Sequence, residues 1–355
     1  MRFAVAEQAA ALRDASDALL GARVTAALIR AAWAAGQPAE FPGAAPLAST
    51  AGVSDVWRGL ANIGLTGALV PAGSGGLGLD ENALPPVLNR VGYSGLPVPV
   101  VETVAVAAPL LAAAGHPALS DVLSGRALVT ANLEATGAAG LPVPFLMVAD
   151  YVLLRAGDEV RLYERGEVDA EPVRAVDGSR QLARLRHPPA GGTPIAAGPA
   201  AAAAWQRGVL GTAAVLTGLG ERMLSMTVEY VQNRHQFGVP VGSFQAVKHR
   251  LADAYVAVEF ARPAVLAAGW AQAAGVADAA EQTSVAKVLA SDAATVVASA
   301  AIQCHGAIGY TTEYDLHLFA KRAWALAAGW GSAGWHRRRL AAAFGLAKEE
   351  GEPGG

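Results

Sequence analysis

The sequence of 355 residues has little cysteine, little charge and no excess of basic residues. Its one cysteine, Cys304, excludes an intramolecular disulfide and is typical of a protein in the reducing cytoplasm. Charged residues make up only 16% of the chain and the net charge is -3, so the sequence offers no basic face to a nucleic acid. The seven histidines are scattered, and because no four ligands follow metal spacing, we expect no metal site.

Long uninterrupted apolar runs are also scarce. The run at 103–115 is too short to cross a bilayer and contains Pro109. The first twenty residues carry Glu7, Arg13 and Asp17 at helical intervals, which indicates an amphipathic helix and not a signal peptide. A Gly-x-Ser-x-Gly motif is missing, so a serine hydrolase would lack its nucleophile. We therefore expect a cytoplasmic protein with no membrane partner.

Hydrophobic residues are abundant, at 53% of the chain, so much of it must be buried inside the fold or between subunits. Helical periodicity dominates both ends of the sequence, whereas short β-branched and aromatic segments bounded by Gly and Asp fill the middle. The pattern predicts a mainly α protein with a small β domain. The predicted regions are an N-terminal helical domain at 1–120, a shortened middle β domain at 121–198 that ends in a loop over 188–201, a C-terminal helical bundle at 199–347, and a flexible tail at 348–355.

Three long helices are predicted in the C-terminal region, and short breaks between them indicate an antiparallel bundle. We expect each helix to bury one stripe of residues. The stripes are Leu216, Leu219, Met223, Met226 and Tyr230 in the first helix, Phe244, Val247, Leu251, Ala254 and Val258 in the second, and Val285, Leu289, Ala293, Val296 and Ala300 in the third.

A short segment, NRHQFGVPVGSFQ at 233–245, interrupts this helical pattern. We expect the helix to end near Phe237, with Gly238 as its cap and Pro240 preventing continuation, and a new helix to start at Phe244. These roles do not explain why the segment places an arginine guanidinium next to side-chain amides and an aromatic ring. That chemistry suits a diphosphate next to an aromatic ring system.

Two further segments contain glycines that could either bind a ligand or simply form a turn. The first, GSGGLG at 73–78, matches the spacing of a dinucleotide fingerprint, but no βαβ unit surrounds it, so a surface loop is the better interpretation. In the second, at 301–323, we expect a buried helix to end at Gln303, to open at Gly306, and to restart near Thr311 or Thr312. Glycines there permit close approach of the backbone to a ligand, although a plain turn between helices would look the same.

Together these segments resemble the acyl-CoA dehydrogenase family of flavoproteins. The family pattern R-x-Q-F-G-x-P-[IV]-x-x-F-Q matches 234–245, and its pattern Q-x-x-G-G-x-G-[YF]-T-x-E-Y matches 303–314 with Ala307 in place of the second glycine. Residues 57–81 are similar to an early family stretch that contains the glycines at 73–78. The resemblance implies a helical N-terminal domain, a middle β domain and a C-terminal four-helix bundle, usually assembled as a tetramer.

The resemblance also implies an activity, a cofactor and a set of binding residues. Members use FAD to convert an acyl-CoA thioester into the trans-2-enoyl thioester, while a glutamate removes the α proton. Residues of the two motifs typically reach across a dimer interface to the FAD of the neighbouring subunit. By match, the cofactor-binding residues here would be Arg234, Gln236, Phe237, Gln245, Gln303 and Gly306.

The sequence departs from the family where the chemistry takes place. The usual base lies in a Y-E-G-T sequence, and here the ungapped match is Gly329, Trp330, Gly331 and Ser332, so that a tryptophan stands for the glutamate. An alternative family position, near 201–211, contains no carboxylate. The loop that wraps the flavin corresponds to 129–140, which keeps Glu134 but has no Pro or Asp in register.

These losses suggest a non-catalytic subunit of a heteromeric acyl-CoA dehydrogenase. It would have no catalytic residue of its own and would complete the FAD site of a catalytic partner subunit in a heterotetramer. A bulky polycyclic thioester, such as a steroid side-chain CoA ester, is the substrate we expect for the complex. Two alternatives stay open, namely a homo-oligomeric enzyme with a relocated base at Glu313 or Asp315, and a scaffold that binds acyl-CoA or protein without flavin.

Overall fold

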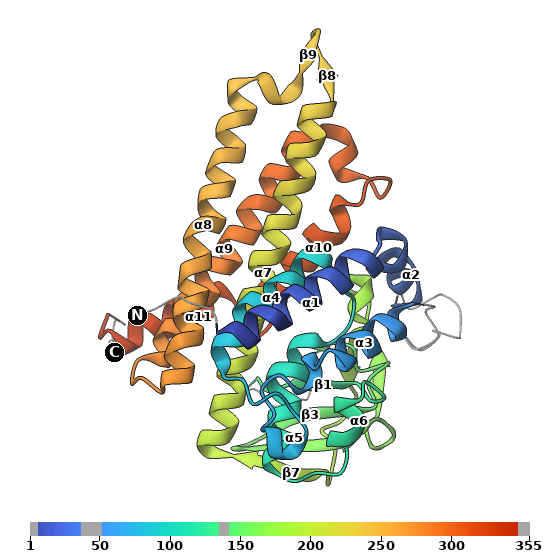
Figure 1. The fold of residues 1–355 in the computed structure, drawn as a ribbon, viewed down its shortest axis with the longest axis vertical. Coiled ribbons are helices and arrows are strands. Elements are labelled where there is room, and N and C mark those ends of the chain that lie inside the picture. Colours follow the sequence, from blue (N-terminus) through green and yellow to red (C-terminus); the bar gives the residue numbers. More distant parts are fainter. Residues whose placement is uncertain (1–5, 37–51, 135–141, 347–355) are drawn as a thin grey trace, which may run out of the picture.

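The computed structural model describes residues 6–36, 52–134 and 142–346. Helices dominate both ends of the chain, with strands between them, which confirms the predicted mainly α fold with a small β part (Figure 1). The division into domains stays a prediction, and the tail at 348–355 lies outside the described residues. The N-terminal helices are α1 (Glu7–Arg23), α2 (Ala26–Gly36), α3 (Val53–Asn62), α4 (Leu84–Ser94), the π-helical segment η5 (Val101–Ala107), α5 (Ala108–Ala113) and α6 (Leu119–Leu123).

The N-terminal helix α3 buries one face, as its sequence periodicity predicts. In α3, Val53, Val56 and Leu60 line the core, with Val56 only 1% exposed. The glycine-rich stretch at 73–78 forms turns, and no strand is found among the described residues before β1. A Cβ on Gly76 would lie 2.1 Å from the Val70 carbonyl oxygen, so this glycine serves tight packing. The observed turns agree with the predicted loop.

The strands between the N-terminal helices and the bundle form two small sheets. One has the order β1-β3-β4-β7, in which β1 and β3 are parallel and the other pairs antiparallel, and the other has the antiparallel order β2-β6-β5. Strand β7 lies inside the segment predicted as a loop over 188–201, so that prediction was wrong. Pairing with β4 satisfies its backbone despite its Pro194. The strands are β1 (Val129–Asn132), β2 (Pro142–Val143), β3 (Tyr151–Ala156), β4 (Glu159–Glu164), β5 (Ala170–Pro172), β6 (Ala183–Leu185) and β7 (Thr193–Ala197).

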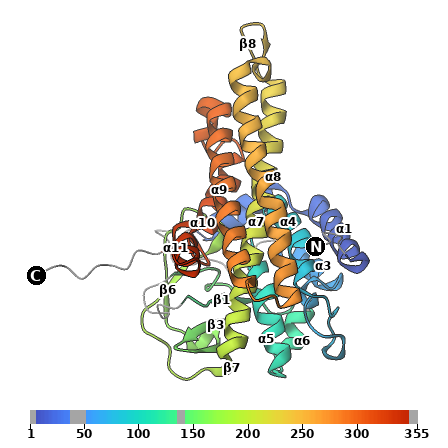
Figure 2. The same cartoon turned by 90° about the vertical axis from the view of Figure 1, so that its left-hand side faces the viewer.

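The C-terminal helices pack as a bundle whose upper part extends well beyond the rest of the molecule (Figures 1 and 2). Helix α7 begins directly after β7 and runs for 36 residues, and α8 returns beside it for 30 residues. Leu216, Leu219 and Met223 are fully buried, as predicted. The helices are α7 (Gly198–Asn233), α8 (Gln245–Ala274), α9 (Ala279–His305), α10 (Leu316–Ala328) and α11 (Ala333–Ala343).

The predicted stripe of the third bundle helix is confirmed only in part. Ala293 and Ala300 are buried and Leu289 packs against the core, but Val285 and Val296 are exposed, at 37% and 45%. Helix α9 buries a broader surface of small residues that also includes Ala290 and Ala294. This helix and its extension, Ala279–Tyr310, are long and apolar enough to cross a membrane, unlike the run at 103–115. More than half of its most apolar window is buried inside the protein, where it packs against α7, α8, α10 and α11.

A buried ion pair joins three parts of the chain. Arg322 of α10 donates to Asp177 at 2.9 Å, and both side chains are nearly inaccessible. The same guanidinium donates to the carbonyl oxygens of Gly95 and Leu96, beyond the end of α4. The pair thereby fixes the segment between β5 and β6 against both α10 and the N-terminal helices.

Candidate functional site

The first motif forms a short β-hairpin at the free end of the bundle. Helix α7 ends at Asn233, and β8 (His235–Gln236) pairs with β9 (Val239–Pro240). Phe237 and Gly238 make the two-residue turn, with φ values of 54° and 81°. The predicted helix end near Phe237 with a Gly238 cap was therefore wrong, because two positive φ values favour a tight hairpin. The predicted restart is confirmed, since α8 begins at Gln245.

The second motif lies at the same end of the bundle. Helix α9 continues to His305, two residues beyond the predicted end, and a 3-10 turn follows over Gly306–Tyr310. The next helix begins at Leu316 and not near Thr311, whose hydroxyl instead accepts from the backbone N–H of Glu313 at 3.3 Å. Gly306 has φ of 65° and ψ of -140°, a conformation that is nearly exclusive to glycine.

Ring stacking holds the two motifs together. The Tyr230 ring, one turn before Arg234, stacks on His305 with a centroid separation of 4.3 Å. Tyr314 contacts both of these rings. The end of α7 and the end of α9 therefore form one surface.

All six predicted cofactor-binding residues are exposed on that surface. The Phe237 side chain is 90% exposed and contacts the Phe244 ring edge-on at 6.2 Å. Within the described part of the chain, the side chains of Arg234 and the three glutamines have no hydrogen-bond or ion-pair partner. An added Cβ on Gly306 would meet no atom within 4 Å, so the backbone there is open to a ligand. The residues in question are Arg234, Gln236, Phe237, Gln245, Gln303 and Gly306.

This surface is far from strands β1 to β7 of the same chain. Figures 1 and 2 place the β8–β9 hairpin at one end of the long axis and the β1–β7 sheet at the opposite end. A ligand that contacts Phe237 would therefore need further walls from another molecule.

Trp330, which stands where the family glutamate is expected, fills the space between the bundle and the strands. Its side chain is only 7% exposed and lies at a ring separation of 5.3 Å from Trp205 of α7. Gly208 of α7 makes room for it, because a Cβ there would lie 2.3 Å from the indole ring. The residue has φ of 55°, a strained value for a side chain of this size, so the surrounding contacts must hold it.

Two buried titratable side chains hold the loop that carries Trp330. Lys287 of α9 donates to the carbonyl oxygens of Ala327 and Gly331, each at 3.0 Å. His336 of α11 donates from Nε2 to the Trp330 carbonyl oxygen at 3.0 Å, and its Nδ1 lies 3.1 Å from the Ser284 hydroxyl, which itself donates to the Ala280 carbonyl oxygen. Burial lowers the pKa of Lys287 to about 7 and that of His336 to about 4.

A buried carboxylate contacts the same indole. Glu102, in η5, is 5% exposed and hydrogen-bonds the Trp330 side chain. Burial raises the pKa of Glu102, although the nearby Arg180 and Arg322 oppose the effect. Glu102 lines a small cavity of about 30 Å³, which Arg180 also lines.

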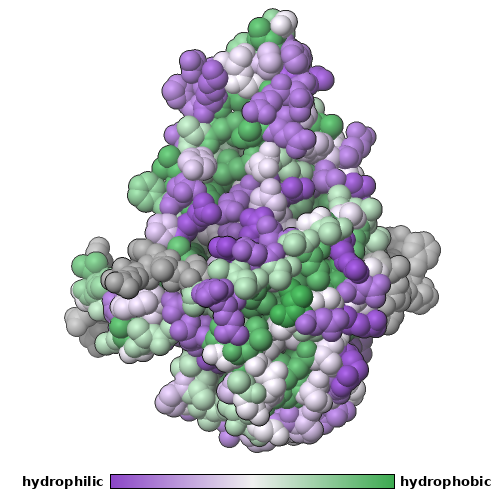
Figure 3. All heavy atoms as spheres, viewed as in Figure 1, coloured by the Kyte–Doolittle hydropathy of each residue, from purple (hydrophilic) through white to green (hydrophobic). Residues whose placement is uncertain are grey.

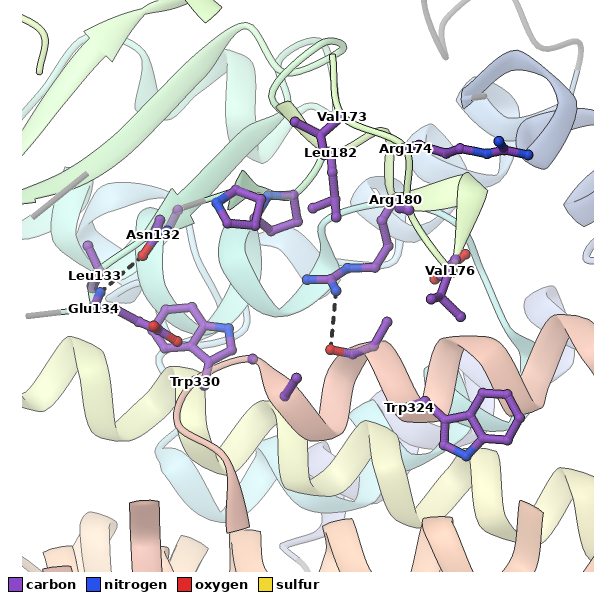
Figure 4. Close-up of a pocket in the computed structure, with 18 residues that line it drawn as sticks. Asn132, Leu133, Glu134, Val173, Arg174, Val176, Arg180, Leu182, Trp324 and Trp330 are labelled. Atoms are coloured by element: carbon purple, nitrogen blue, oxygen red, sulfur yellow. Dashed lines mark hydrogen bonds between the residues drawn. The ribbon is translucent and has the colours of Figure 1, made fainter. Parts of the chain in front are cut away.

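Two larger cavities lie on either side of the Trp330 loop and share Leu133, Glu134 and Ala328. One, of about 490 Å³, lies between the strands and α10, with Arg180 inside it and Trp330 at one end (Figure 4). The other, of about 610 Å³, is lined by two indoles and three arginines: Trp205, Trp335, Arg155, Arg338 and Arg339. Of the predicted flavin-wrapping segment 129–140, Glu134 lines both cavities, and 135–140 lies outside the described residues.

The two halves of the family's flavin site fit the cofactor differently. At the bundle end, an exposed guanidinium, an exposed ring and an open glycine suit a dinucleotide. In the 490 Å³ cavity, Pro142 and Pro144 offer no backbone N–H, and Arg180 brings a cation. Among the described residues this wall lacks the row of donors that the edge of a flavin ring requires.

Sequence reasoning missed Glu102, Arg180, Lys287 and His336. A signal exists for two of them, because Glu102 and Lys287 are single charges inside long apolar segments. The other two could not be separated from surface arginines and histidines without the fold.

Comparison with known proteins agrees with this architecture. Residues 198–345 match the family "Acyl-CoA dehydrogenase, C-terminal domain". The chain is 33% identical over 291 residues to "Acyl-CoA dehydrogenase IpdE2" of Mycobacterium tuberculosis (strain ATCC 25618 / H37Rv), covering 79% of this chain and 83% of that relative.

Two solved structures resemble the whole chain. The "ChsE4-ChsE5 complex from Mycobacterium tuberculosis" has a TM-score of 0.83 at 25% identity, covering 98% of this chain and 100% of that one. The "Tcur3481-Tcur3483 steroid ACAD G363A variant" has a TM-score of 0.81 at 26% identity, covering 96% and 98%. Fold, motifs and relatives agree, and the chain belongs to the acyl-CoA dehydrogenase family.

Proposed function

We propose that this chain is the non-catalytic subunit of a heteromeric, FAD-dependent acyl-CoA dehydrogenase. The observation that carries the proposal is the contrast between its two ends. At one end, cofactor-binding side chains are exposed and unpaired within the described residues, and at the other, Trp330 is buried where a base is needed. The names of both solved structures, ChsE4-ChsE5 and Tcur3481-Tcur3483, join two proteins, which supports a partner subunit for this chain.

The bundle end would complete the partner's cofactor site. Arg234 would neutralise a diphosphate, and Phe237 would lie against the adjoining rings. Bound FAD would supply the hydride acceptor for oxidation of the acyl thioester. Gln236, Gln245 and Gln303 would supply further hydrogen bonds, and the open backbone at Gly306 would allow close approach of the ligand.

A partner also explains the apolar surface of the protruding bundle. Tyr255 and Phe260 of α8 are 57% and 69% exposed, and Val256 lies between them. Figure 3 shows hydrophobic surface between polar side chains along this part of the molecule. Exposed aromatic side chains on a rigid helix pair are typical of protein interfaces.

We assign the proton-accepting carboxylate and the acyl-CoA cleft to the partner. In this chain Trp330 occupies the corresponding space, and its packing on Gly208 leaves no room for an acyl chain there. Because one solved relative is described as a steroid ACAD, we propose a steroid side-chain CoA ester as the substrate of the complex.

Flavin content tests the proposal. The chain would be purified alone and together with the product of a neighbouring gene, and bound FAD would be quantified from its absorbance. We expect almost no flavin in the isolated chain and one flavin for each pair of unlike chains. A fully loaded homo-oligomer that reduces an acceptor with acyl-CoA would disprove the proposal, and a flavin-free complex would favour a scaffold.

The structure favours a different candidate residue for the alternative of a homo-oligomeric enzyme with a relocated base. Asp315 is paired with Arg30 at 2.6 Å, and Glu313 is exposed at the bundle end. Neither lies near Trp330. Glu102 is the carboxylate that contacts the Trp330 indole, so it replaces them as the residue to test.

A further inference from the structure

The 490 Å³ cavity contains an arginine that lacks a close counterion. Arg180 Nη1 donates to the Ala325 carbonyl oxygen at 3.2 Å, while its Nε is buried without a hydrogen-bond partner in the described part of the chain. Figure 4 shows the guanidinium inside the cavity, pointing along it towards the end formed by Trp330.

The nearest carboxylates are engaged elsewhere. Both oxygens of Asp177 are used, one by the Ser179 backbone and hydroxyl and the other by Arg322. Glu102 hydrogen-bonds Trp330, and burial raises its pKa, which weakens it as a counterion. Within the described residues Arg180 makes no ion pair within 4 Å. A cation in such surroundings gains strongly from an incoming anion.

The backbone around Arg180 is fixed. Asp177 accepts from the Ser179 N–H at the start of a 3-10 turn over Gly178–Arg180. The next residue, Gln181, is held at φ of 42° and ψ of 57°, the left-handed region that side chains avoid. Strain next to a buried charge is a common feature of binding sites.

Most of the remaining wall is apolar and comes from Leu133, Pro142, Pro144, Val173, Leu182 and Trp324. Asn132, Glu134, Arg174 and Asp177 also line the cavity, and the Glu134 carboxylate accepts from the Gly331 backbone N–H at 3.5 Å. The cavity thus combines the Arg180 guanidinium with a largely hydrophobic wall.

We propose that this cavity is a binding site for an apolar carboxylic acid, whose carboxylate pairs with Arg180 while its hydrocarbon part lies against the proline and leucine walls. The site is separate from the bundle end and does not depend on a partner's flavin.

The test uses decanoate and its uncharged analogue decanamide as probes of the same shape. Calorimetric titration of the 355-residue chain, alone and in its complex, should give at least about tenfold tighter binding of decanoate, because a charge-assisted hydrogen bond contributes roughly 1.5–3 kcal/mol. Arg180→Met should remove this preference. Arg174→Met is the matched control, since Arg174 also lines the cavity but is exposed and points away from it.

Equal binding of the two probes by the unsubstituted chain would overturn the proposal, as would a preference that survives in Arg180→Met. Stoichiometric displacement of decanoate from the isolated chain by FAD would also overturn it, because the cavity would then be a flavin site. If Arg180→Met does not fold by circular dichroism, Arg180→Lys keeps the charge and should still prefer decanoate. Flavin content of the complex is measured separately, so either proposal can fail alone.

Discussion

At the scale of single residues, the region around Trp330 depends on side chains whose charge is suppressed by burial. Burial lowers the pKa of His336 to about 4, so this side chain is neutral at pH 7, where it donates to the Trp330 carbonyl oxygen. Lys287 donates its hydrogen bonds from a buried position, where the charged form of its amine is destabilised by loss of solvent. The strained conformation of Trp330 is therefore sensitive to proton uptake.

This sensitivity gives a pH prediction. The folded pKa of His336 is about 4, below its ordinary value near 6.5, so unfolding takes up a proton between these values. Stability from this group is fully present above pH 6.5 and falls towards pH 4, by at most about 3 kcal/mol. Urea unfolding from pH 7 to pH 4 measures it, and His336→Gln should show a shallower loss. An identical pH dependence in both proteins would contradict the assignment.

A substitution of Glu102 discriminates between the proposed non-catalytic subunit and the alternative of an enzyme with a relocated base. In the assembled complex, Glu102→Gln should leave turnover of the acyl-CoA within about twofold, because this buried carboxylate lines neither of the two larger cavities, and the amide can still accept from the indole. Steady-state kinetics measures the effect, with unfolding curves as the control for folding. A loss of about a hundredfold or more in kcat would instead make Glu102 a base.

At the scale of elements, the β8–β9 hairpin is a rigid presentation of one aromatic ring. Phe237→Ala should weaken flavin retention by the complex by about tenfold, since exposed aromatic anchors dominate binding sites. Stability of the isolated chain should not change, because the ring is 90% exposed. Flavin release during dialysis measures the first effect. Phe344→Ala, an exposed phenylalanine beyond α11, is the control and should retain flavin normally.

The sequence predicted the long helices well but not how they end or face. Periodicity located α7 and α8, and the buried residues of α8 do follow one stripe, although α7 buries every residue from Gly208 to Gly220. On α9 it was right for Ala293 and Ala300 but wrong for Val285 and Val296, because burial by alanines on several sides leaves no single apolar face. The hairpin was missed because Gly238 and Pro240 also fit a helix end. Motif matching identified Trp330, but only tertiary packing reveals its contacts with Glu102, Lys287 and His336.

At the scale of the whole molecule, the Arg322–Asp177 pair couples α10, the strands and the N-terminal helices. Removing one partner leaves a buried charge uncompensated, so Asp177→Asn or Arg322→Met should each cost about 3–5 kcal/mol. The double variant should cost clearly less than the sum of the two. Chemical denaturation of the four proteins measures the cycle. Additive losses would show that the pair does not act as a unit.

The protruding α7–α8 helix pair should make the unassembled chain sensitive to proteolysis. Few other parts of the chain pack against its far end, so in a newly synthesised chain this end would be exposed to proteases until the proposed partner subunit binds. Trypsin should cut the solitary chain near Arg234 and spare the assembled one. Cellular proteases acting in the same way would remove unpaired copies and keep the two polypeptides in matched amounts.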